Sequence, residues 1–169
     1  MRVIVNDANI LIDLVELGLL QQFFGLPFEF QTTAPIMDEL YDYQQAKLDP
    51  YIQSTSLVVV DFSEDDLNEI NQINLRKPTL SPQDCSAFFQ AGKVAGILVT
   101  GDNSLKKHAR NNHVEAYGHL WVFDRMVECN VLSGMDATTA LRNLTEVINP
   151  RLGIPKTECQ RRYDTWSLL

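Results

Sequence analysis

The stretch Arg2-Val3-Ile4-Val5-Asn6-Asp7-Ala8-Asn9 decides how this chain folds. Its β-branched run ends abruptly in polar residues, and a longer apolar segment beginning at Ile10 follows. This pattern predicts a strand that is buried on both faces and leads into a helix. Asp7 is therefore expected at the carboxyl end of a central strand, where open α/β sheets bind ligands. A lone Asp in this place also fits a turn or a helix cap, and that simpler role is the more frequent one.

The composition indicates one ordinary globular domain. The chain has 169 residues, of which 45% are hydrophobic and 21% charged, which is enough to bury a sizeable core. We expect residues 1–150 to form this domain and residues 151–169 to be a C-terminal tail, packed on the domain or placed at an interface. The apolar run 3–5 is too short for a signal peptide, and no stretch approaches the roughly 20 residues of a membrane span. A cytoplasmic protein is the resulting expectation.

Charge and cysteine content narrow the function further. The net charge of −8 argues against a broad electrostatic footprint for nucleic acid, so a phosphate-bearing substrate requires a local basic rim or a metal ion. Cys85, Cys129 and Cys159 are odd in number and have neither CxxC spacing nor a His partner. They are predicted to be reduced thiols rather than a disulfide framework or a zinc site.

Strands and helices alternate along the chain, which predicts a parallel sheet with helices on both faces. A helix over 10–17 is expected to direct Asp13 and Glu16 away from its apolar face, and a helix over 36–45 to begin with Pro35 in its first turn. The third strand is expected to be fully buried. We expect the later strands at 28–33, 57–60, 97–100 and 114–118, and the later helices at 64–74, 82–94, 105–110, 120–129 and 137–148.

Four carboxylates recur near the predicted carboxyl edge of this sheet. Asp7 and Asp102 each follow directly on a strand, and parallel strands bring both to the same edge. Glu39 is expected in the second turn of the helix after the second strand, and Asp84 in the first turn of the helix before the fourth. Each acid has a structural alternative, since Asp84 and Asp102 can cap helices and Glu39 can lie on a solvated face. Clustered carboxylates repel one another unless a cation neutralises them, and oxygen ligands without His or Cys favour Mg²⁺ or Mn²⁺.

These residues carry a family resemblance. The acids stand in four short motifs, Asp7-Ala8-Asn9, Pro35–Leu40 around Glu39, Leu80–Ala87 around Asp84, and Thr100-Gly101-Asp102 followed by Ser104-Leu105. Their combination and order over about residues 3–135 resemble the PIN domain family of metal-dependent ribonucleases. The chain looks most like the small single-domain members, which include the VapC-like toxins of toxin–antitoxin pairs.

The resemblance implies a three-layer α/β/α fold with a five-stranded parallel sheet of order 3-2-1-4-5. It implies that an acidic quartet binds Mg²⁺ or Mn²⁺ and hydrolyses RNA phosphodiester bonds, with an antitoxin protein as a further partner. By their positions, Asp7, Glu39, Asp84 and Asp102 match the quartet. Asn9 and Thr100 match supporting polar positions, and Asn103 stands where the family also has basic or other polar residues.

Substrate binding would require cations near the acids. Lys106, Lys107 and Arg110 follow Asp102 on one helix, and a second basic pair, Arg76 and Lys77, precedes Asp84. We expect these cations to contact the RNA backbone, although a solvated helix face accounts for the same run. The three histidines, at 108, 113 and 119, share no ligand spacing and are interpreted as surface or hydrogen-bonded residues.

Two other functions fit parts of the sequence. A PIN-like fold retained as a nucleic-acid or protein binding module would keep the acids without holding metal. A receiver-type phosphoacceptor domain also gathers acids at strand ends, but it has an acidic pair after its first strand and a Lys after its last. Asn6-Asp7 and Tyr117-Gly118 do not match that pattern. We also expect a homodimer that pairs through the helices after the second strand and after Asp102, or through the tail.

Overall fold

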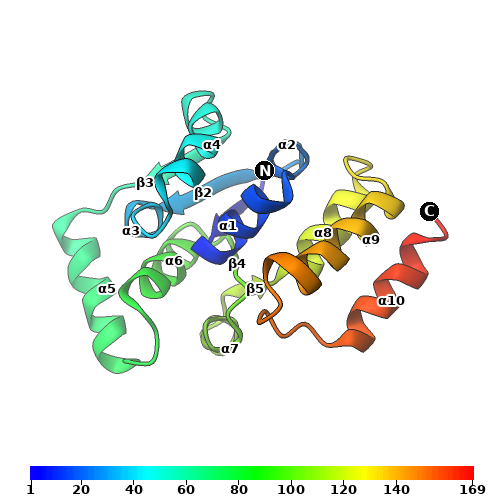
Figure 1. Ribbon diagram of the computed structural model, residues 1–169. Helices are drawn as coiled ribbons and strands as arrows, with labels where there is room; N and C mark the ends of the chain where they lie inside the picture. Colours follow the sequence, from blue (N-terminus) through cyan, green and yellow to red (C-terminus); the bar gives the residue numbers. More distant parts are fainter.

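The computed structural model describes residues 1–169 and contains one five-stranded parallel sheet (Figure 1). The strand order β3-β2-β1-β4-β5 confirms the predicted three-layer α/β/α architecture, with β1 at the centre. Both neighbours of β1 run parallel to it, so its carboxyl end and that of β4 open at the same edge. The strands are β1 (Val3–Asn6), β2 (Glu29–Thr33), β3 (Leu57–Val60), β4 (Ile97–Val99) and β5 (Glu115–Tyr117).

Helices cover both faces of the sheet because each parallel connection must cross it in the right-handed sense. Helices α1 and α4 contact each other on one face, and α6 contacts α7 on the other. No helix is long and apolar enough to cross a membrane. The helices are α1 (Ala8–Leu17), α2 (Leu20–Phe24), α3 (Ala34–Met37), α4 (Asp42–Gln53), α5 (Glu64–Arg76), α6 (Pro82–Lys93), α7 (Asn103–Asn111), α8 (His119–Glu128), α9 (Gly134–Asn143), a π-helical turn (Leu144–Ile148) and α10 (Lys156–Trp166).

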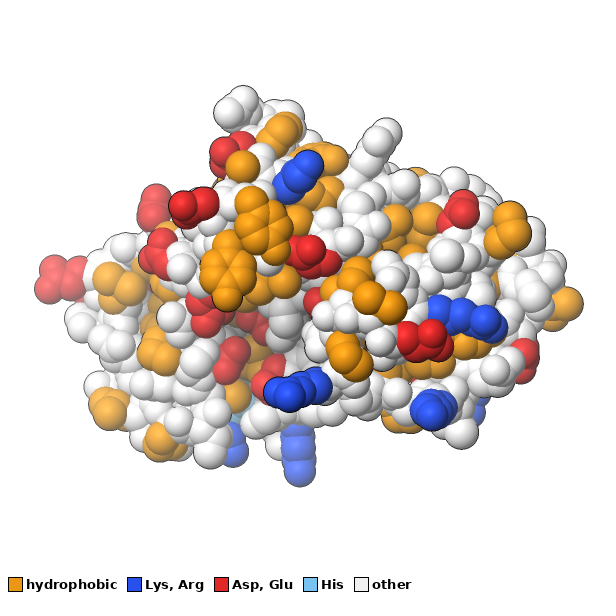
Figure 2. Space-filling view, in the orientation of Figure 1, with side chains coloured by type: hydrophobic (Ala, Val, Ile, Leu, Met, Phe, Trp, Pro, Cys, Tyr) orange, Lys and Arg blue, Asp and Glu red, His pale blue; other side chains and the backbone are white.

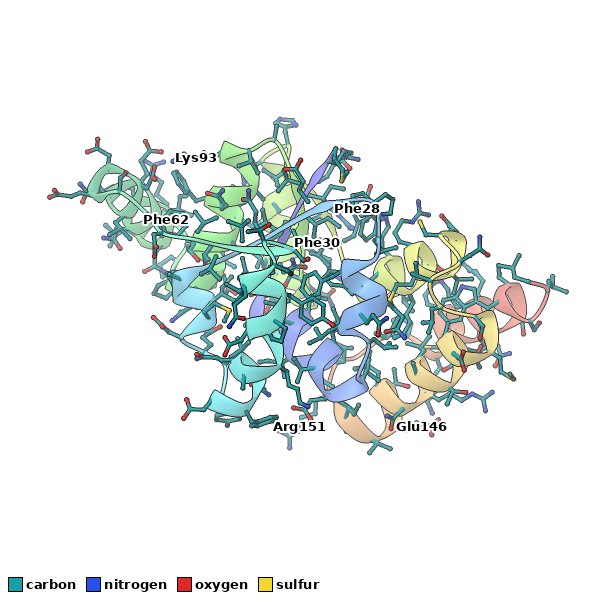
Figure 3. The ribbon with its side chains drawn as sticks, turned by 90° about the horizontal axis from the view of Figure 1, so that it is seen from above. Phe28, Phe30, Phe62, Lys93, Glu146 and Arg151 are labelled. Atoms are coloured by element: carbon teal, nitrogen blue, oxygen red, sulfur yellow. The ribbon has the colours of Figure 1, made fainter.

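The apolar residues of the central strands form the core. Ile4 and Val5 of β1 are fully buried, and Phe30 of β2 packs with its ring centroid 4.7 Å from that of Phe23 in α2 (Figure 3). The third strand differs from the prediction, because Val58 is 45% exposed. β3 lies at one edge of the sheet and pairs with β2 alone, so Val58 is not fully covered.

The expected helix over 36–45 is wrong in its extent. The chain forms α3 and then, after the link Asp38–Tyr41, the separate and longer helix α4. Side chains of the next helix satisfy the backbone at this break. Gln45 Nε2 donates to the carbonyls of Met37 and Leu40 at 2.9 and 3.0 Å, and Gln44 Oε1 accepts from the Tyr41 N–H. Periodicity alone did not reveal the break because these contacts involve polar residues.

Asp13 also differs from the prediction, since its side chain is buried rather than directed to solvent. It accepts hydrogen bonds from His119 Nε2 at 2.8 Å and from Asn149 Nδ2 at 3.1 Å. His119 begins α8, and Asn149 follows the π-helical turn that packs on α1, so nothing local to the α1 sequence indicates them. His119 is accordingly a hydrogen-bonded histidine, one of the two roles expected for it.

The tail forms α10, which packs on α8 and α9 at the red end of the chain (Figure 1). Trp166 is 3% exposed and donates from Nε1 to Asp124 Oδ1 at 3.2 Å. Arg162 forms an ion pair with the other oxygen of the same carboxylate at 3.0 Å. The last helix is therefore fixed to the body of the protein by one aromatic anchor and one partly buried charge pair.

Candidate active site at the carboxyl edge of the sheet

Asp7 lies at the end of the central strand and is the N-cap of α1. Its Oδ1 accepts from the Ala8 N–H at 2.8 Å, and its Oδ2 accepts from Asn9 Nδ2 at 3.0 Å and from Thr100 Oγ1 at 2.6 Å. The side chain is 3% exposed. Asp7 can therefore be both a helix cap and part of a site, because the capping hydrogen bond holds its carboxylate at the edge where β1 and β4 end.

The turn after β4 is joined to Asp7 through two polar side chains. Thr100 is buried and also accepts from the Asp102 N–H at 3.0 Å. The Gly101 N–H donates to Asn9 Oδ1 at 2.8 Å. Asn9 and Thr100, both expected as supporting residues, therefore hold the β4 turn against the start of α1.

Asp84 and Asp102 each use one carboxylate oxygen to begin a helix. Asp84 Oδ2 accepts from the Ser81 N–H at 2.8 Å in a capping box, and Asp102 Oδ1 accepts from the Leu105 N–H at 2.7 Å. The second oxygen of each side chain has no protein hydrogen-bond partner. The predicted structural role is present for both residues, and it leaves one oxygen of each free for a ligand.

Glu39 is not in the second turn of a helix as predicted. It lies exposed in the link between α3 and α4, and both of its carboxylate oxygens are without a protein partner. The start of α3 is fastened to α6 by a 2.7 Å hydrogen bond between Thr33 Oγ1 and Ser86 Oγ. Both side chains are fully buried, and this contact brings the α3–α4 link beside the helix that carries Asp84.

The electrostatics show that three of the acids act on one another. Burial is the largest cause that raises the pKa of Asp7 to about 6, and the carboxylates of Asp84 and Glu39 raise it further, against the hydrogen bond from Thr100. The pKa of Glu39 is also raised, first because its carboxylate, although exposed, loses part of its surrounding water to neighbouring groups, and then by the charge of Asp84. Such mutual repulsion is what a cation would relieve. Figure 2 shows acidic side chains gathered left of the centre of the face in view.

No three His, Cys, Asp or Glu side chains are grouped so that together they could hold a metal ion. Mg²⁺ does not require such a group, because it is commonly bound by one or two carboxylates and keeps several waters and substrate phosphates as its other ligands. The donors at this edge are carboxylate oxygens without thiolate or imidazole, which suits a hard divalent cation.

The basic residues expected around the site do not all have the same role. Arg110 donates from Nε and Nη2 to the Ala116 carbonyl at 3.0 and 2.6 Å, which ties α7 to β5. Lys107 is exposed, whereas Lys106 is partly buried. Lys77 lies close enough to α7 to lower the pKa of His108, after the larger effect of burial. Figure 2 shows blue side chains directly below the carboxylates, over α7 and the link to α10.

Two buried polar residues behind the site had not been predicted. Asn6 precedes Asp7 and donates to the Gln31 carbonyl at 3.1 Å, while its own Oδ1 has no partner. Ser86 donates to the Gln83 carbonyl at 2.7 Å besides its contact with Thr33. A polar residue inside an apolar strand end is the only sequence signal for Asn6, and the helical period of α6 gives none for Ser86.

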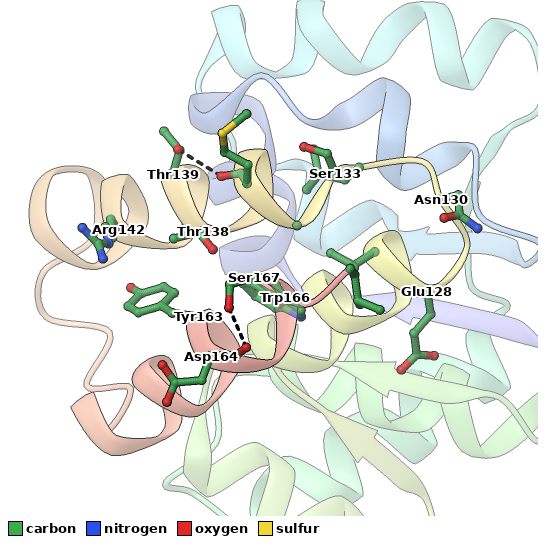
Figure 4. Close-up of a pocket in the computed structure, with 15 residues that line it drawn as sticks. Glu128, Asn130, Ser133, Thr138, Thr139, Arg142, Tyr163, Asp164, Trp166 and Ser167 are labelled. Carbon is green, nitrogen blue, oxygen red and sulfur yellow. Dashed lines mark hydrogen bonds between the residues drawn. The ribbon is translucent and has the colours of Figure 1, made fainter.

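A large pocket lies elsewhere, between α8, α9 and α10 (Figure 4). It has a volume of about 1190 Å³, and Met135, Arg142, Tyr163 and Trp166 are among its lining residues. None of the four predicted acids lines it. The carboxylates that perturb one another lie instead at the carboxyl edge of the sheet.

The model of a PIN domain family matches residues 3–157. The chain belongs to the PIN domain family. The match covers the whole sheet and reaches the start of α10, so it includes all four acids. PIN domains are in general nucleases that use divalent metals, and the chain therefore carries a nuclease-like module. A comparison with curated proteins finds no match.

Proposed function

We propose that this protein is a metal-dependent ribonuclease that hydrolyses phosphodiester bonds of RNA with Mg²⁺ or Mn²⁺. The observation that carries the proposal is the raised pKa of Asp7, which results from burial beside Asp84 and Glu39. Keeping this carboxylate ionised at neutral pH is costly for the metal-free protein. A divalent cation removes that cost, and a protein without such a ligand gains nothing from the arrangement.

The chain's own residues divide the work. Asp7, held by Thr100 and Asn9, would bind the ion, together with the free oxygens of Asp84 and Asp102. A bound divalent ion supplies Lewis-acid stabilisation of the phosphoryl oxygens and lowers the pKa of a water molecule. Glu39, exposed and with both oxygens free, would orient that water and accept its proton, for which its raised pKa suits it.

Cleavage of RNA under controlled metal tests this proposal. The protein should cleave single-stranded RNA with Mg²⁺ or Mn²⁺, and excess EDTA should stop the reaction. Asp7→Asn should lower the rate at least about 10³-fold, since metal ions contribute several kcal/mol and each 1.4 kcal/mol is tenfold. Asp136→Asn, which alters an exposed acid at the start of α9, is the matched control and should retain activity. Retained cleavage in EDTA would contradict the mechanism.

The alternative function is a nucleic-acid or protein binding module without nuclease activity. The absence of a ready three-ligand metal group favours it. Calorimetric titration of Mg²⁺ or Mn²⁺ into wild type and Asp7→Asn separates the two functions. Heat of binding that disappears in the variant supports the enzyme, and no heat in either protein supports the module.

We propose RNA as the substrate and, from the resemblance to VapC-like proteins, an antitoxin as protein partner. The exposed rings of Tyr41 and Tyr43 stack 6.2 Å apart beside Glu39, which supports a protein surface next to the site because Tyr is enriched at interfaces. The same surface and α7 are the proposed contacts of a homodimer. Light scattering at micromolar concentration tests the dimer, and a small antitoxin-like reading frame next to the gene tests the toxin role.

A further inference from the structure

A second pocket, with a volume of about 150 Å³, is lined by Gly101 and Asn103, the two chain neighbours of Asp102. The link Leu152–Pro155, which leads into α10, also lines it, and Leu152 lies close to Gly101. Gly101 is the residue whose N–H donates to Asn9, which in turn donates to Asp7. The pocket and the acidic edge therefore share a wall. Figure 1 shows the link passing next to β5 and α7.

The pocket contains an ammonium group without a counter-ion. Lys106 lines it and belongs to none of the ion pairs of the chain. Burial and then the positive charge of Arg110 lower the pKa of Lys106, and the carboxylate of Asp102 only partly opposes them. In a protein of net charge −8, an unpaired and partly buried Lys is a costly feature that a bound anion would offset.

A buried imidazole faces the same space. His119 is 6% exposed and lines the pocket, and its Nε2 is engaged by Asp13. Its Nδ1 lies next to Gly101, so that a Cβ added there would come within 3.2 Å of this nitrogen. Nδ1 has no hydrogen-bond partner in the protein. A protonated ring would donate from Nε2 to Asp13 and from Nδ1 to an anion in the pocket.

Gly118 keeps the space around the ammonium open. Its φ of −117° is available to any residue, so the glycine is not needed for backbone conformation. A Cβ at this position would lie 2.9 Å from Lys106 Nζ. The absence of a side chain at Gly118 thus allows the Lys106 ammonium to sit inside the pocket.

We infer that this pocket binds a phosphate group of the RNA strand next to the one that is cleaved, with Lys106 and His119 as its ligands. The inference rests on the proposed function, because it takes the polyanion to be RNA. An ammonium and an imidazole N–H around a small open cavity suit the tetrahedral oxygens of a phosphate. Lys106 and His119 are positioning residues that set the register of the strand relative to the acids.

Binding of inorganic phosphate to the metal-free protein tests the pocket without any cleavage. The ring nitrogens of His119, observed by nitrogen-detected NMR, should shift with millimolar phosphate in wild type. Lys106→Met should weaken phosphate binding about tenfold, and Gly118→Ala should do the same by displacing the ammonium. Lys47→Met, which alters an exposed lysine on α4, should leave it unchanged. No His119 shift in wild type, or an unchanged shift in both pocket variants, would overturn the inference.

RNA cleavage gives the second readout. Lys106→Met should raise KM about tenfold with kcat nearly unchanged, and should flatten the salt dependence by about 0.7 in log–log slope, the value for one phosphate of a single strand. The increase in KM is then compared for an oligonucleotide with a 5′-hydroxyl and for its 5′-phosphorylated form. If Lys106→Met raises KM equally for both, the pocket binds an internal phosphodiester. If Lys106→Met raises KM only for the 5′-phosphorylated form, the pocket binds the phosphate at the end of the strand.

The two proposals fail in different ways. If RNA is cleaved with Mg²⁺ and Lys106→Met changes neither KM nor the salt slope, the pocket is wrong and the ribonuclease stands. If no RNA is cleaved, the proposed function fails and the assignment of the pocket to RNA fails with it, while phosphate binding that depends on Lys106 would still show an anion site.

Discussion

Asp7 is the N-cap of α1 and Asp13 lies within the same helix. Both are 3% exposed, but the groups that surround the two carboxylates differ. Asp13 accepts from the imidazole of His119 and the amide of Asn149. Asp7 accepts only from neutral donors, and the charges that act on it are the carboxylates of Asp84 and Glu39.

The difference separates a structural carboxylate from a functional one better than burial or position does. A buried acid that accepts hydrogen bonds from a second segment stabilises the contact between the two segments. A buried acid among other acids keeps a repulsion that folding alone does not relieve, and a ligand of opposite charge can relieve it. The region around Asp13 therefore holds α8 on α1, while the region around Asp7 is prepared for a cation.

The largest expected effect is the difference in stability between the alanine variants of the two acids. Asp13→Ala should lower the free energy of unfolding by about 3 kcal/mol, because it leaves a buried imidazole and amide unpaired. Asp7→Ala should change it by less than about 1 kcal/mol in chelator at pH 8, because loss of the N-cap is offset by loss of the repulsion. Urea unfolding of both variants measures this. Equal losses would show that the two acids have the same structural role.

The pH dependence of stability should sharpen the comparison. The pKa of Asp7 in the folded protein, about 6, lies above its ordinary value of 3.8, so the folded state binds a proton more readily than the unfolded chain. Stability of the chelated protein should therefore fall as the pH rises from about 4 to above 6, by up to about 3 kcal/mol for a shift of this size.

Thermal or urea unfolding at pH 4.5 and 7.5 measures this fall, and Asp7→Asn should remove most of it. With saturating Mg²⁺ the trend should reverse, because the ion binds the ionised carboxylates. A chelated wild type and Asp7→Asn with the same pH profile would show that Asp7 is not the source.

Local signals in the sequence were sufficient for most of the fold. β-branched runs predicted several of the strands, and the helices expected at 64–74 and 82–94 are confirmed, each beginning with a Ser-x-x-Asp capping box, at Ser63 and Ser81. These signals succeed because a cap involves residues three positions apart. The parallel order of the sheet then placed Asp7 and Asp102 at one edge.

Contacts between distant segments could not be predicted in the same way. The burial of Asp13 depends on His119, more than a hundred positions away, and the exposure of Val58 depends on β3 being the outermost strand. The position of Glu39 depends on side-chain caps from Gln44 and Gln45 at a break in an otherwise regular pattern. The roles of the four acids in catalysis remain predictions.

The smallest expected effect concerns Asp84, which both caps α6 and repels Asp7. Asp136 provides the matched control, because it accepts from Ser133 at the start of α9, far from the other acids. Asp136→Asn should cost a few tenths to about 1 kcal/mol of stability, with or without Mg²⁺, because only the cap and dipole contributions change. Asp84→Asn should cost less than this in chelator, since the repulsion of Asp7 and Glu39 is relieved.

Mg²⁺ should then stabilise Asp84→Asn less than wild type, because stabilisation follows RT ln(1 + [L]/Kd) and Kd will have risen. Melting curves of the three proteins in both conditions give the answer. If Asp84→Asn and Asp136→Asn lose the same stability in both conditions, Asp84 is a cap alone, and the repulsion attributed to it does not contribute to metal binding.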